Sequence, residues 1–512
     1  MRSSQTSRDG ISLKNLFPPG QVIGAEDVFI QSCCGEWSDV RDGDLFVAIV
    51  DEKSDGHDSV EKAIAKGASA ILAERMLAVD IPQFIVGNSR QAYSRICQTL
   101  AGSPSQYLKT IAVTGSDGKT TVSHLLHSIL ASAGETSAIA SSLKIGRGHK
   151  NNNACQKTFA NSLTPPDLAN WLCHSTLEGC DHAILESTSV QLANHQLNGV
   201  ELDAAVITNI RSNHLDYHNS VANYRQVTAR ILDHLKPTGF AVMNMDDPGS
   251  HQMIPDIKVP TITFGIKQQS EVQATPLEEG FSDQTFMLTA GNESAPVRTA
   301  IIGRNHIYNC LAAASTALAL GIDLPTIVRG LENIQRIGGR LERVECGQEF
   351  AVFVDSATTP RRLGSTLASL RRIARRRLIC VAATNGNNPA ERQEFGQIIE
   401  KASDLPIIST PGIAESQQLE LIHQMLDGFS NPATAHSIPD RVKAIEWALS
   451  QAKPGDCVAV LGFGEKPVIS LDDGRWHLTD REICQAWLYD QPISPIFNAT
   501  DSKIFRIDDF RS

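Results

Sequence analysis

A glycine-rich loop between an apolar run and a helical pattern constrains the fold of this chain more than any other segment. It reads Val113-Thr114-Gly115-Ser116-Asp117-Gly118-Lys119-Thr120-Thr121 and follows an apolar run at 110–113. Glycines let the backbone wrap around phosphate oxygens, and the N-terminus of the following helix directs N–H groups and a partial positive charge at them. The pattern predicts that Lys119 lies at the β- and γ-phosphates of a nucleotide and that the Thr120 hydroxyl is a ligand of Mg²⁺.

The loop is a shorter variant of the common phosphate-binding motif, which has a glycine at the position of Val113. A glycine-rich turn with a solvated lysine is the alternative interpretation. The order of strand, loop and helix is the context that the motif requires, and it favours nucleotide binding.

Apolar runs alternate with helical patterns along most of the chain, which is typical of α/β folds. The runs are short and continuous, as in parallel strands that are buried on both faces. We expect strands at 44–50, 70–73, 83–86, 110–113, 183–185, 204–207, 351–354, 378–381 and 458–461, and helices at 60–66, from 122, at 309–320 and at 324–334. At roughly 150 residues per domain, 512 residues correspond to three domains, with boundaries at 101–105 and at Gly338-Gly339.

Composition excludes several classes of protein. The 46 Lys and Arg residues against 57 Asp and Glu residues give a net charge of −11, which argues against a general binder of nucleic acid or anionic membranes. The first ten residues lead into no apolar segment, and no run reaches the roughly 20 apolar residues of a spanning helix. The 11 cysteines include no C-x-x-C pair, so we expect neither a disulfide framework nor a zinc site. These features predict a multidomain cytoplasmic protein that does not insert into a membrane.

Two further residues follow predicted strands near the loop. Glu186 follows the strand at 183–185, and His214 follows the strand at 204–207. Ligands bind at the carboxyl ends of strands in open parallel sheets, so we expect both residues to converge with Lys119 on one crevice. Taken singly, each residue is more simply a capping carboxylate or a hydrogen-bonded loop histidine, and only their joint placement indicates a Mg·ATP site.

These motifs resemble those of the Mur ligase family, and more narrowly its UDP-N-acetylmuramoyl-tripeptide synthetases, over nearly the whole chain. The family's T-G-x-x-G-K-T-T loop corresponds to residues 114–121. Other matching segments occur in family order: Gly43-Asp44-Leu45-Phe46-Val47, Asp55-Gly56-His57-Asp58, Thr208-Asn209, His214-Leu215-Asp216-Tyr217-His218, Asn244-Met245-Asp246-Asp247, Tyr308-Asn309-Cys310-Leu311, Gly339-Arg340-Leu341-Glu342, Val354-Asp355 and Thr359-Pro360.

The resemblance implies an α/β fold of three domains. They are a UDP-substrate-binding domain at 1–105, a central ATPase domain with a phosphate loop and parallel sheet at 106–336, and a Rossmann-like amino-acid-binding domain at 337–512. It also implies a reaction of peptidoglycan precursor synthesis, in which ATP and Mg²⁺ activate the carboxylate of a UDP-N-acetylmuramoyl-peptide as an acyl phosphate. The amine of an amino acid then displaces phosphate and forms an amide.

The resemblance also implies roles for single residues. Lys119, Glu186 and His214 would be catalytic, and Thr120, Glu186 and His214 would hold Mg²⁺. Nucleotide contacts would come from the loop and from Asn309, Arg340 and Asp355. The precursor would contact Thr164, Thr188, Asn194 and Gln196, and Arg392 would hold a carboxylate of the amino acid.

The sequence departs from the family where chemistry is expected. Thr228 stands where the tripeptide synthetases have a lysine, usually carbamylated, that binds a second Mg²⁺, so we expect weaker binding of that metal. Further departures are Asn213 before the histidine, Thr358 in the family's D-Y-A-H-x-P segment, Ser409-Thr410-Pro411-Gly412 in its D-N-P-R segment, Lys466 at its G-K-G-H-E glutamate, Asn194-His195-Gln196 at its Gln-x-Arg and Glu36-Trp37-Ser38 at its D-S-R. Lys466 would repel a distal ammonium of diaminopimelate or lysine.

Two other functions compete with an active ligase. A nucleotide-binding regulatory protein that lost turnover would explain Thr228, Thr358 and Lys466. A folylpolyglutamate-type ligase would share the scaffold, but the first hundred residues argue against it. The phosphate loop, Glu186 and His214 favour the ATP-dependent amide ligase.

Overall fold

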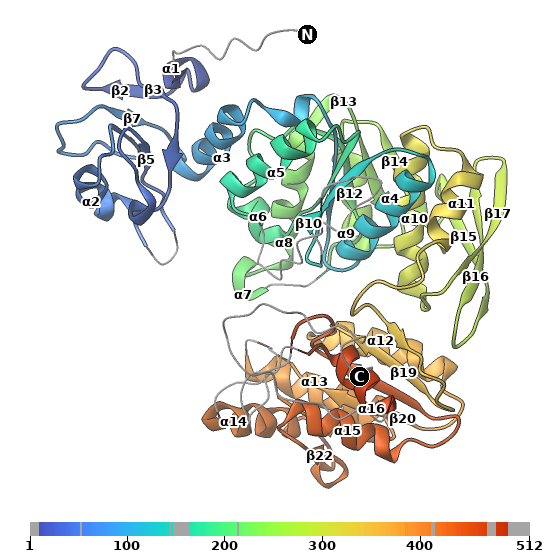
Figure 1. The fold of residues 1–512 in the computed structure, drawn as a ribbon. Coiled ribbons are helices and arrows are strands. Elements are labelled where there is room, and N and C mark those ends of the chain that lie inside the picture. The colour runs from blue at the N-terminus through green and yellow to red at the C-terminus, as the bar shows by residue number, and fades with distance from the viewer. Residues whose placement is uncertain are drawn as a thin grey trace, which may run out of the picture. The chain divides into compact units, whose positions relative to one another are not determined.

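The computed structural model describes residues 10–51, 54–143, 145–146, 163–211, 215–384, 386, 388–410, 415–467 and 478–489. The chain divides into two compact units (Figure 1). One consists of residues 1–119 and 134–263, and the other of residues 120–133 and 264–512. Among the described residues, no helix combines the length and the apolar character that crossing a bilayer demands.

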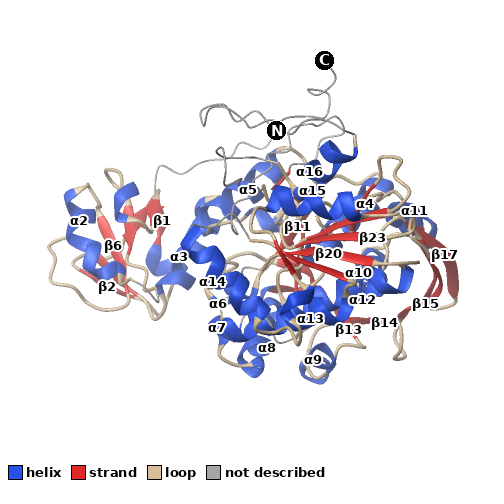
Figure 2. Cartoon of the chain, turned by 90° about the horizontal axis from the view of Figure 1, so that it is seen from below, coloured by secondary structure: helices blue, strands red, loops and turns tan. Residues whose placement is uncertain are grey.

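The first unit begins with a five-stranded sheet in the order β2-β7-β6-β5-β4. Its strands are β2 (Gln21–Ile23), β4 (Cys33–Cys34), β5 (Leu45–Val47), β6 (Ala70–Ala73) and β7 (Gln83–Ile85), and only the β2–β7 pair is antiparallel. Helices α2 (Val60–Ala65) and α3 (Ser89–Leu100) cover opposite faces of this sheet (Figure 2). Leu45 packs in the cluster that includes α3, and Phe46 packs in the cluster that includes α2, so successive residues of β5 are buried by different helices. Short elements precede it, namely β1 (Ile11–Ser12), α1 (Leu13–Leu16) and β3 (Phe29–Ile30).

The second sheet of this unit is built around β8 (Lys109–Thr114). Parallel neighbours β11 (His182–Glu186) and β12 (Leu202–Ile207) flank it, and β9 (Ser137–Ala140) and β13 (Leu235–Asn244) follow on either side. Residues 110–114 of β8, 183–185 of β11 and 204–207 of β12 are all buried, which confirms the three strands predicted here from continuous apolar runs. Strands β9 and β13 were not predicted. The remaining elements are β10 (Ile145–Gly146), α5 (Pro165–Leu177), α6 (Ser189–Ala193), α7 (Leu215–His218), α8 (Val221–Ala229) and α9 (Pro248–His251).

The second unit contains almost all of α4 (Lys119–Ser132), with α10 (Arg304–Ala319) and α11 (Leu324–Glu332). A Cβ at Gly330 of α11 would lie 2.5 Å from the Cα of Ile129 in α4, so this glycine permits close helix packing. The strands β14 (Thr261–Gly265), β15 (Val272–Glu279), β16 (Gln284–Ala290) and β17 (Glu293–Thr299) were not predicted. In β16 the buried Phe286 and Leu288 alternate with partly exposed residues, which a search for continuous apolar runs does not detect.

The rest of the second unit is a six-stranded sheet in the order β18-β19-β23-β20-β21-β22. The strands are β18 (Glu342–Val344), β19 (Ala351–Asp355), β20 (Leu378–Ala382), β21 (Leu405–Ile408), β22 (His436–Ser437) and β23 (Cys457–Leu461), and only β18 is antiparallel to its neighbour. The helices are α12 (Pro360–Ile373), α13 (Pro389–Ala402), α14 (Glu415–Leu426), α15 (Arg441–Gln451) and α16 (Asp480–Leu488). Phe353 packs in the cluster of α12, α13 and α14, whereas Val352 and Val354 pack in that of α15 and α16. Helices therefore cover both faces, as in Rossmann-like folds.

Three local predictions need correction. Helix α4 begins at Lys119 rather than near 122, and α10 begins at Arg304 rather than at 309. Both helices start with polar residues after a glycine of positive φ, so their apolar periodicity begins a turn after the helix does. The stretch 101–105 is no exposed linker, because Pro104 and Ser105 are buried and the Ser105 hydroxyl accepts a hydrogen bond from the amide of Glu201 at 3.0 Å.

Two helical glycines provide a matched test of helix packing. A Cβ at Gly396 of α13 would lie 1.9 Å from the carbonyl oxygen of Met425 in α14, whereas a Cβ at Gly364 of α12 meets no atom closer than 3.8 Å. We expect Gly396→Ala to lower the free energy of unfolding by about 1–3 kcal/mol through overpacking. Gly364→Ala should leave it unchanged or raise it by up to about 1 kcal/mol, because alanine favours helix. Urea unfolding of the two variants measures both, and equal effects would contradict the close approach.

Candidate functional site

The glycine-rich loop is clamped by the two residues that follow β12. The amide of Ser116 donates to the carbonyl of Asn209 at 2.9 Å, and the amide of Asp117 donates to Asn209 Oδ1 at 3.0 Å. In return, Thr208 Oγ1 donates to the carbonyl of Asp117 at 2.6 Å. Gly115 has φ +133°, and a Cβ there would lie 2.2 Å from Thr208 Oγ1, so only glycine fits. The glycine-rich loop and Thr208-Asn209 thus form one hydrogen-bonded unit at the carboxyl ends of β8 and β12.

Helix α4 starts directly from this loop. Lys119 is its first residue, and its Nζ donates to the carbonyl of Gly115 at 2.8 Å, so the side chain folds back over the loop. Thr120 and Thr121 follow and are buried. The first amides of a helix have no partner within the helix, and together with the lysine ammonium they make this end attractive to phosphate. The predicted loop residues are therefore brought together in the geometry that the motif requires.

A buried tyrosine that the sequence did not reveal supports the loop from α8. The hydroxyl of Tyr224 lies 3.0 Å from Ser116 Oγ, which also accepts the amide of Arg211 at 2.9 Å. Burial raises the pKa of Tyr224, so its hydroxyl stays protonated at neutral pH. The ring of His218 packs edge-on against it at 5.2 Å. No sequence motif marks Tyr224, because it lies 108 residues from Ser116 along the chain.

Removing that hydroxyl tests whether it positions the loop. We expect Tyr224→Phe to weaken ATP binding about fivefold, corresponding to the loss of one hydrogen bond of about 1 kcal/mol, while the protein stays folded. The measurement is the KM for ATP in a phosphate-release assay, with kcat recorded alongside. Tyr107→Phe is the control, because that side chain is exposed. An unchanged KM in Tyr224→Phe would show that the loop holds its shape without this contact.

Glu186 lies beside the loop on the neighbouring strand. It ends β11 in register with Val113 of β8, and its Oε2 accepts the amide of Ser142 at 2.9 Å. A carboxylate and a threonine hydroxyl supply the oxygen ligands that Mg²⁺ prefers. Within the described residues, no group of three or more His, Cys, Asp or Glu side chains could hold a metal alone. Oxygen donors of these two kinds suit a Mg²⁺ that takes its other ligands from phosphates and water.

The third predicted metal ligand, His214, lies outside the described residues, as does Asn213. The position of the expected lysine, Thr228, is described and fully buried, with Oγ1 donating to the carbonyl of Tyr224 at 2.8 Å. Its hydroxyl is thus engaged within α8.

The residues predicted to bind the precursor have structural partners of their own. Thr164 caps α5, and Thr188 caps α6 in a reciprocal arrangement with Gln191. Gln196 Oε1 is buried and makes no hydrogen bond within the described residues. Asn194 Oδ1 accepts a hydrogen bond from Arg90, which also donates to the carbonyl of Val50 and to Asp51, each at 2.7 Å.

Arg90 is a second residue that the sequence did not reveal. Its hydrogen bonds join the loop after β5 to Asn194, which follows the last residue of α6. A single arginine in an ordinary helix does not stand out in the sequence. Only the fold shows that Arg90 contacts both Val50-Asp51 and Asn194.

The predicted residues of the second unit lie on several of its elements. Asn309 is partly exposed on α10. Asp355 ends β19, and its Oδ2 accepts the amide of Leu341 at 2.8 Å. Arg340 donates to the carbonyl of Gly339 and to Ser356 Oγ. Arg392 donates to the carbonyl of Gly386 at 2.9 Å and to Gln424. Arg340 and Asp355 are thus joined through the segment that follows Gly339, and Arg392 is separate from them on α13.

Two family models match segments of this chain. Residues 113–317 match the Mur ligase middle domain, and residues 339–464 match the Mur ligase glutamate ligase domain. The chain is 31% identical to the UDP-N-acetylmuramoyl-L-alanyl-D-glutamate--2,6-diaminopimelate ligase of Geobacillus kaustophilus over 87% of this chain and 92% of the relative. It is 32% identical to the ligase of the same name from Syntrophomonas wolfei over 87% of this chain and 91% of the relative.

Solved structures show the same fold. A UDP-N-acetylmuramoyl-L-alanyl-D-glutamate--2,6-diaminopimelate ligase aligns with a TM-score of 0.68 at 24% identity, over 94% of this chain and 99% of that one. A MurF ligase from Thermotoga maritima, in complex with ADP, aligns with a TM-score of 0.62 at 19% identity, over 90% of this chain and 98% of that one.

Proposed function

The chain belongs to the Mur ligase family of ATP-dependent ligases, and from this premise we propose that it adds an amino acid to a UDP-N-acetylmuramoyl-dipeptide. The observation that carries the proposal is the loop at residues 115–118, clamped by Thr208 and Asn209 and followed directly by α4. This loop and the start of α4 hold a nucleoside triphosphate with its terminal phosphate near Lys119. The nucleotide-binding regulatory protein is the less favoured alternative, since the relatives described above are named as ligases.

The proposed reaction has two steps. A carboxylate oxygen of the precursor attacks the γ-phosphorus of ATP, the bond to the β-phosphate oxygen breaks, and ADP leaves from the acyl phosphate. The amine of the amino acid then attacks the acyl carbon, the carbon–oxygen bond to phosphate breaks, and the amine loses a proton as the amide forms.

The chain's own groups offset the repulsion between the two anionic reactants. Lys119 and the first amides of α4 would stabilise the negative charge that is shared by the γ-phosphate oxygens. Thr120 and Glu186, with His214 by family resemblance, would hold Mg²⁺, which supplies further positive charge at the phosphates when bound. Asn309, Arg340 and Asp355 would contact the nucleotide.

The precursor and the amino acid would bind at separate sets of residues. We assign Thr164, Thr188, Asn194 and Gln196 to the precursor, with Arg392 on a carboxylate of the amino acid. Gln196 is the best supported of these, because its buried Oε1 finds no donor in the part of the chain that the structure describes, and a buried acceptor without a donor is costly unless a ligand supplies one. Lys466 and the absence of a carboxylate in Ser409-Thr410 disfavour an amino acid with a distal ammonium.

The division into domains at 1–105, 106–336 and 337–512 and the cytoplasmic location belong to the same proposal. A single assay tests its centre. The full chain is incubated with ATP, Mg²⁺, UDP-N-acetylmuramoyl-L-alanyl-D-glutamate and one amino acid at a time. The masses of the products are measured by mass spectrometry. We expect one amino acid to give a product heavier than the precursor by that amino acid less water, with one ADP formed per product. ADP formation that no amino acid stimulates, without any such product, would refute the ligase.

A further inference from the structure

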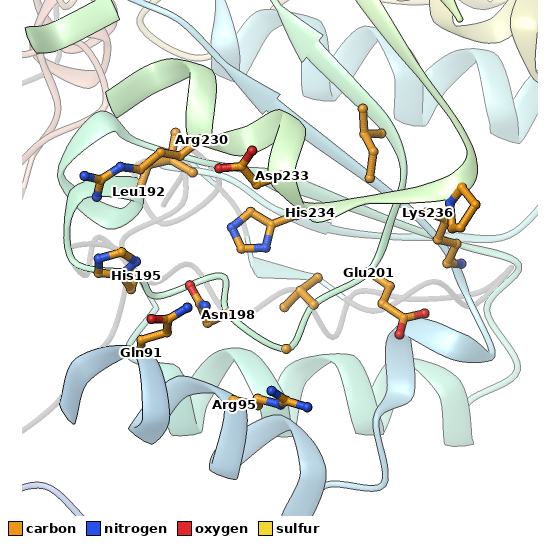
Figure 3. A pocket seen from close by; sticks show the side chains of 14 residues that line it. Gln91, Arg95, Leu192, His195, Asn198, Glu201, Arg230, Asp233, His234 and Lys236 are labelled. Carbon is orange, nitrogen blue, oxygen red and sulfur yellow. The ribbon is translucent and has the colours of Figure 1, made fainter. Parts of the chain in front are cut away.

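A cavity of about 680 Å³ lies in the first unit and is unused by the proposed reaction. Its walls come from α3, from the segment at 192–201 and from the segment at 230–237 (Figure 3). Its volume is within the range of small-molecule sites. Most of the side chains that line it are polar or charged.

The cavity is at the opposite edge of the sheet from the phosphate loop. Glu201 immediately precedes β12, and Leu235 begins β13, so these lining residues mark the amino ends of two parallel strands. The loop is clamped by Thr208, after the carboxyl end of β12. At about 3.3 Å per residue, the strand separates the two places by roughly 20 Å. A ligand in the cavity therefore does not occupy the nucleotide site.

One end of the cavity holds an arginine, a histidine and an asparagine. His195, held at φ +56°, lies with Arg230 and Asn198 on the same side of the view in Figure 3. Burial lowers the pKa of His195, and the charges of Arg230 and Arg90 lower it further, while a hydrogen bond with Asn198 opposes them. Burial likewise lowers the pKa of His234, with Asp233 raising it and His195 lowering it. Both imidazoles are therefore neutral near pH 7, and the charge of Arg230 adds to this at His195, whereas Asp233 opposes it at His234.

Three of the other charged side chains that line the cavity contact residues outside its lining. Lys236 pairs with Asp203 at 2.8 Å, and Glu201 accepts a hydrogen bond from Gln106 at 3.4 Å. The guanidinium of Arg95 lies over the ring of Phe17. Arg230 makes one long hydrogen bond, 3.4 Å to the carbonyl of Ala193, and pairs with no carboxylate within the described residues. Asp233 is exposed and adjacent to His234 in sequence.

We propose that this cavity binds a small anion with a phosphate group, held by Arg230 together with His195 and His234. The planar guanidinium offers a fork of N–H donors that matches phosphate oxygens, and each imidazole gains a proton beside an anion and becomes a further donor. The charge of Arg230 disfavours a cation beside His195. Arg230, His195 and His234 are not among the residues assigned to the proposed ligase reaction.

Calorimetric titration with inorganic phosphate tests the site. The phosphate loop of the full chain is first filled with Mg²⁺ and a non-hydrolysable ATP analogue. We expect saturable binding that Arg230→Gln weakens about tenfold or more, the loss expected for a charge-assisted contact. Arg225→Gln is the matched control, because this arginine is on the preceding helix, bonds Gln252 and does not line the cavity. Absence of saturable binding, or equal affinity in the two variants, would overturn the proposal.

Two further arms define the chemistry. Sulfate remains a dianion between pH 8 and pH 6, so its affinity should rise severalfold over this range as His195 and His234 take up protons, and His195→Gln with His234→Gln should remove the rise. A pH-independent affinity in the unchanged chain would overturn the role of the imidazoles. Displacement of phosphate by UDP but not by uridine would identify a nucleoside diphosphate as the source of the bound phosphate group. If UDP does not displace phosphate, the ligand is free phosphate or a small phosphate ester.

Discussion

Replacing Lys119 by alanine is expected to lower the rate of ATP-dependent product formation by about 10²–10³-fold, the effect of removing one preorganised positive group from a site of developing negative charge. Lys119 Nζ reaches back to the carbonyl of Gly115, over the concave face of the loop, so its charge lies where the terminal phosphates are proposed to bind. The measurement is kcat for phosphate release with precursor and amino acid present.

A lysine at the amino end of β8, the strand that precedes the loop, is the control. Lys109 begins β8 and is exposed, so Lys109→Ala changes the net charge equally but leaves the loop intact. It should retain nearly the full rate. If kcat of the Lys119→Ala protein is within threefold of that of the unchanged chain, Lys119 does not stabilise the transferred phosphate as proposed.

The second large effect concerns stability. Asp480→Asn is expected to lower the free energy of unfolding by about 3–5 kcal/mol, because it leaves a buried guanidinium without its counter-charge. The Arg441 and Asp480 side chains are 1% and 0% exposed, with Arg441 Nη2 and Asp480 Oδ2 2.9 Å apart. Arg441 also donates to the carbonyl of Leu461 at 3.0 Å, so the pair ties α15, α16 and the end of β23 together. Denaturant unfolding followed by circular dichroism gives the value.

An exposed ion pair and a double replacement complete that test. Asp283→Asn breaks the pair with Arg298, whose side chain is 72% exposed, and should leave the unfolding midpoint near that of the unchanged chain. Replacing Arg441 and Asp480 together by Met and Leu should recover most of the lost stability, since no unpaired charge remains buried. If Asp480→Asn and Asp283→Asn destabilise equally, burial does not govern the energy of the pair.

The sequence was sufficient where local physics decides the structure. The run 110–113 and Gly115 predict a strand and a phosphate loop because burial on both faces and positive φ each leave a direct signal in residue type. Strands β15, β16 and β17 were missed because each is half-exposed, and the starts of α4 and α10 because their first turns are polar.

The site was predictable only where residues form a motif. Lys119 lies beyond the carboxyl end of β8 and Glu186 ends the neighbouring strand β11, so a placement at the same edge of the sheet could be inferred from strand order. Tyr224 and Arg90 contact the site from distant segments, and nothing in their neighbours along the chain marks them. The weaker second metal site expected from Thr228 stays a prediction, supported by a hydroxyl already engaged with the carbonyl of Tyr224.

Isotope transfer tests the central claim most directly. The full chain is given ATP, Mg²⁺, the amino acid that supports turnover, and precursor whose reacting carboxylate carries oxygen-18 in both positions. If the carboxylate attacks the γ-phosphorus and the amine then displaces phosphate, each released phosphate carries one oxygen-18 and the amide retains the other. Phosphate that contains no oxygen-18 while ATP is consumed would contradict the ligase account.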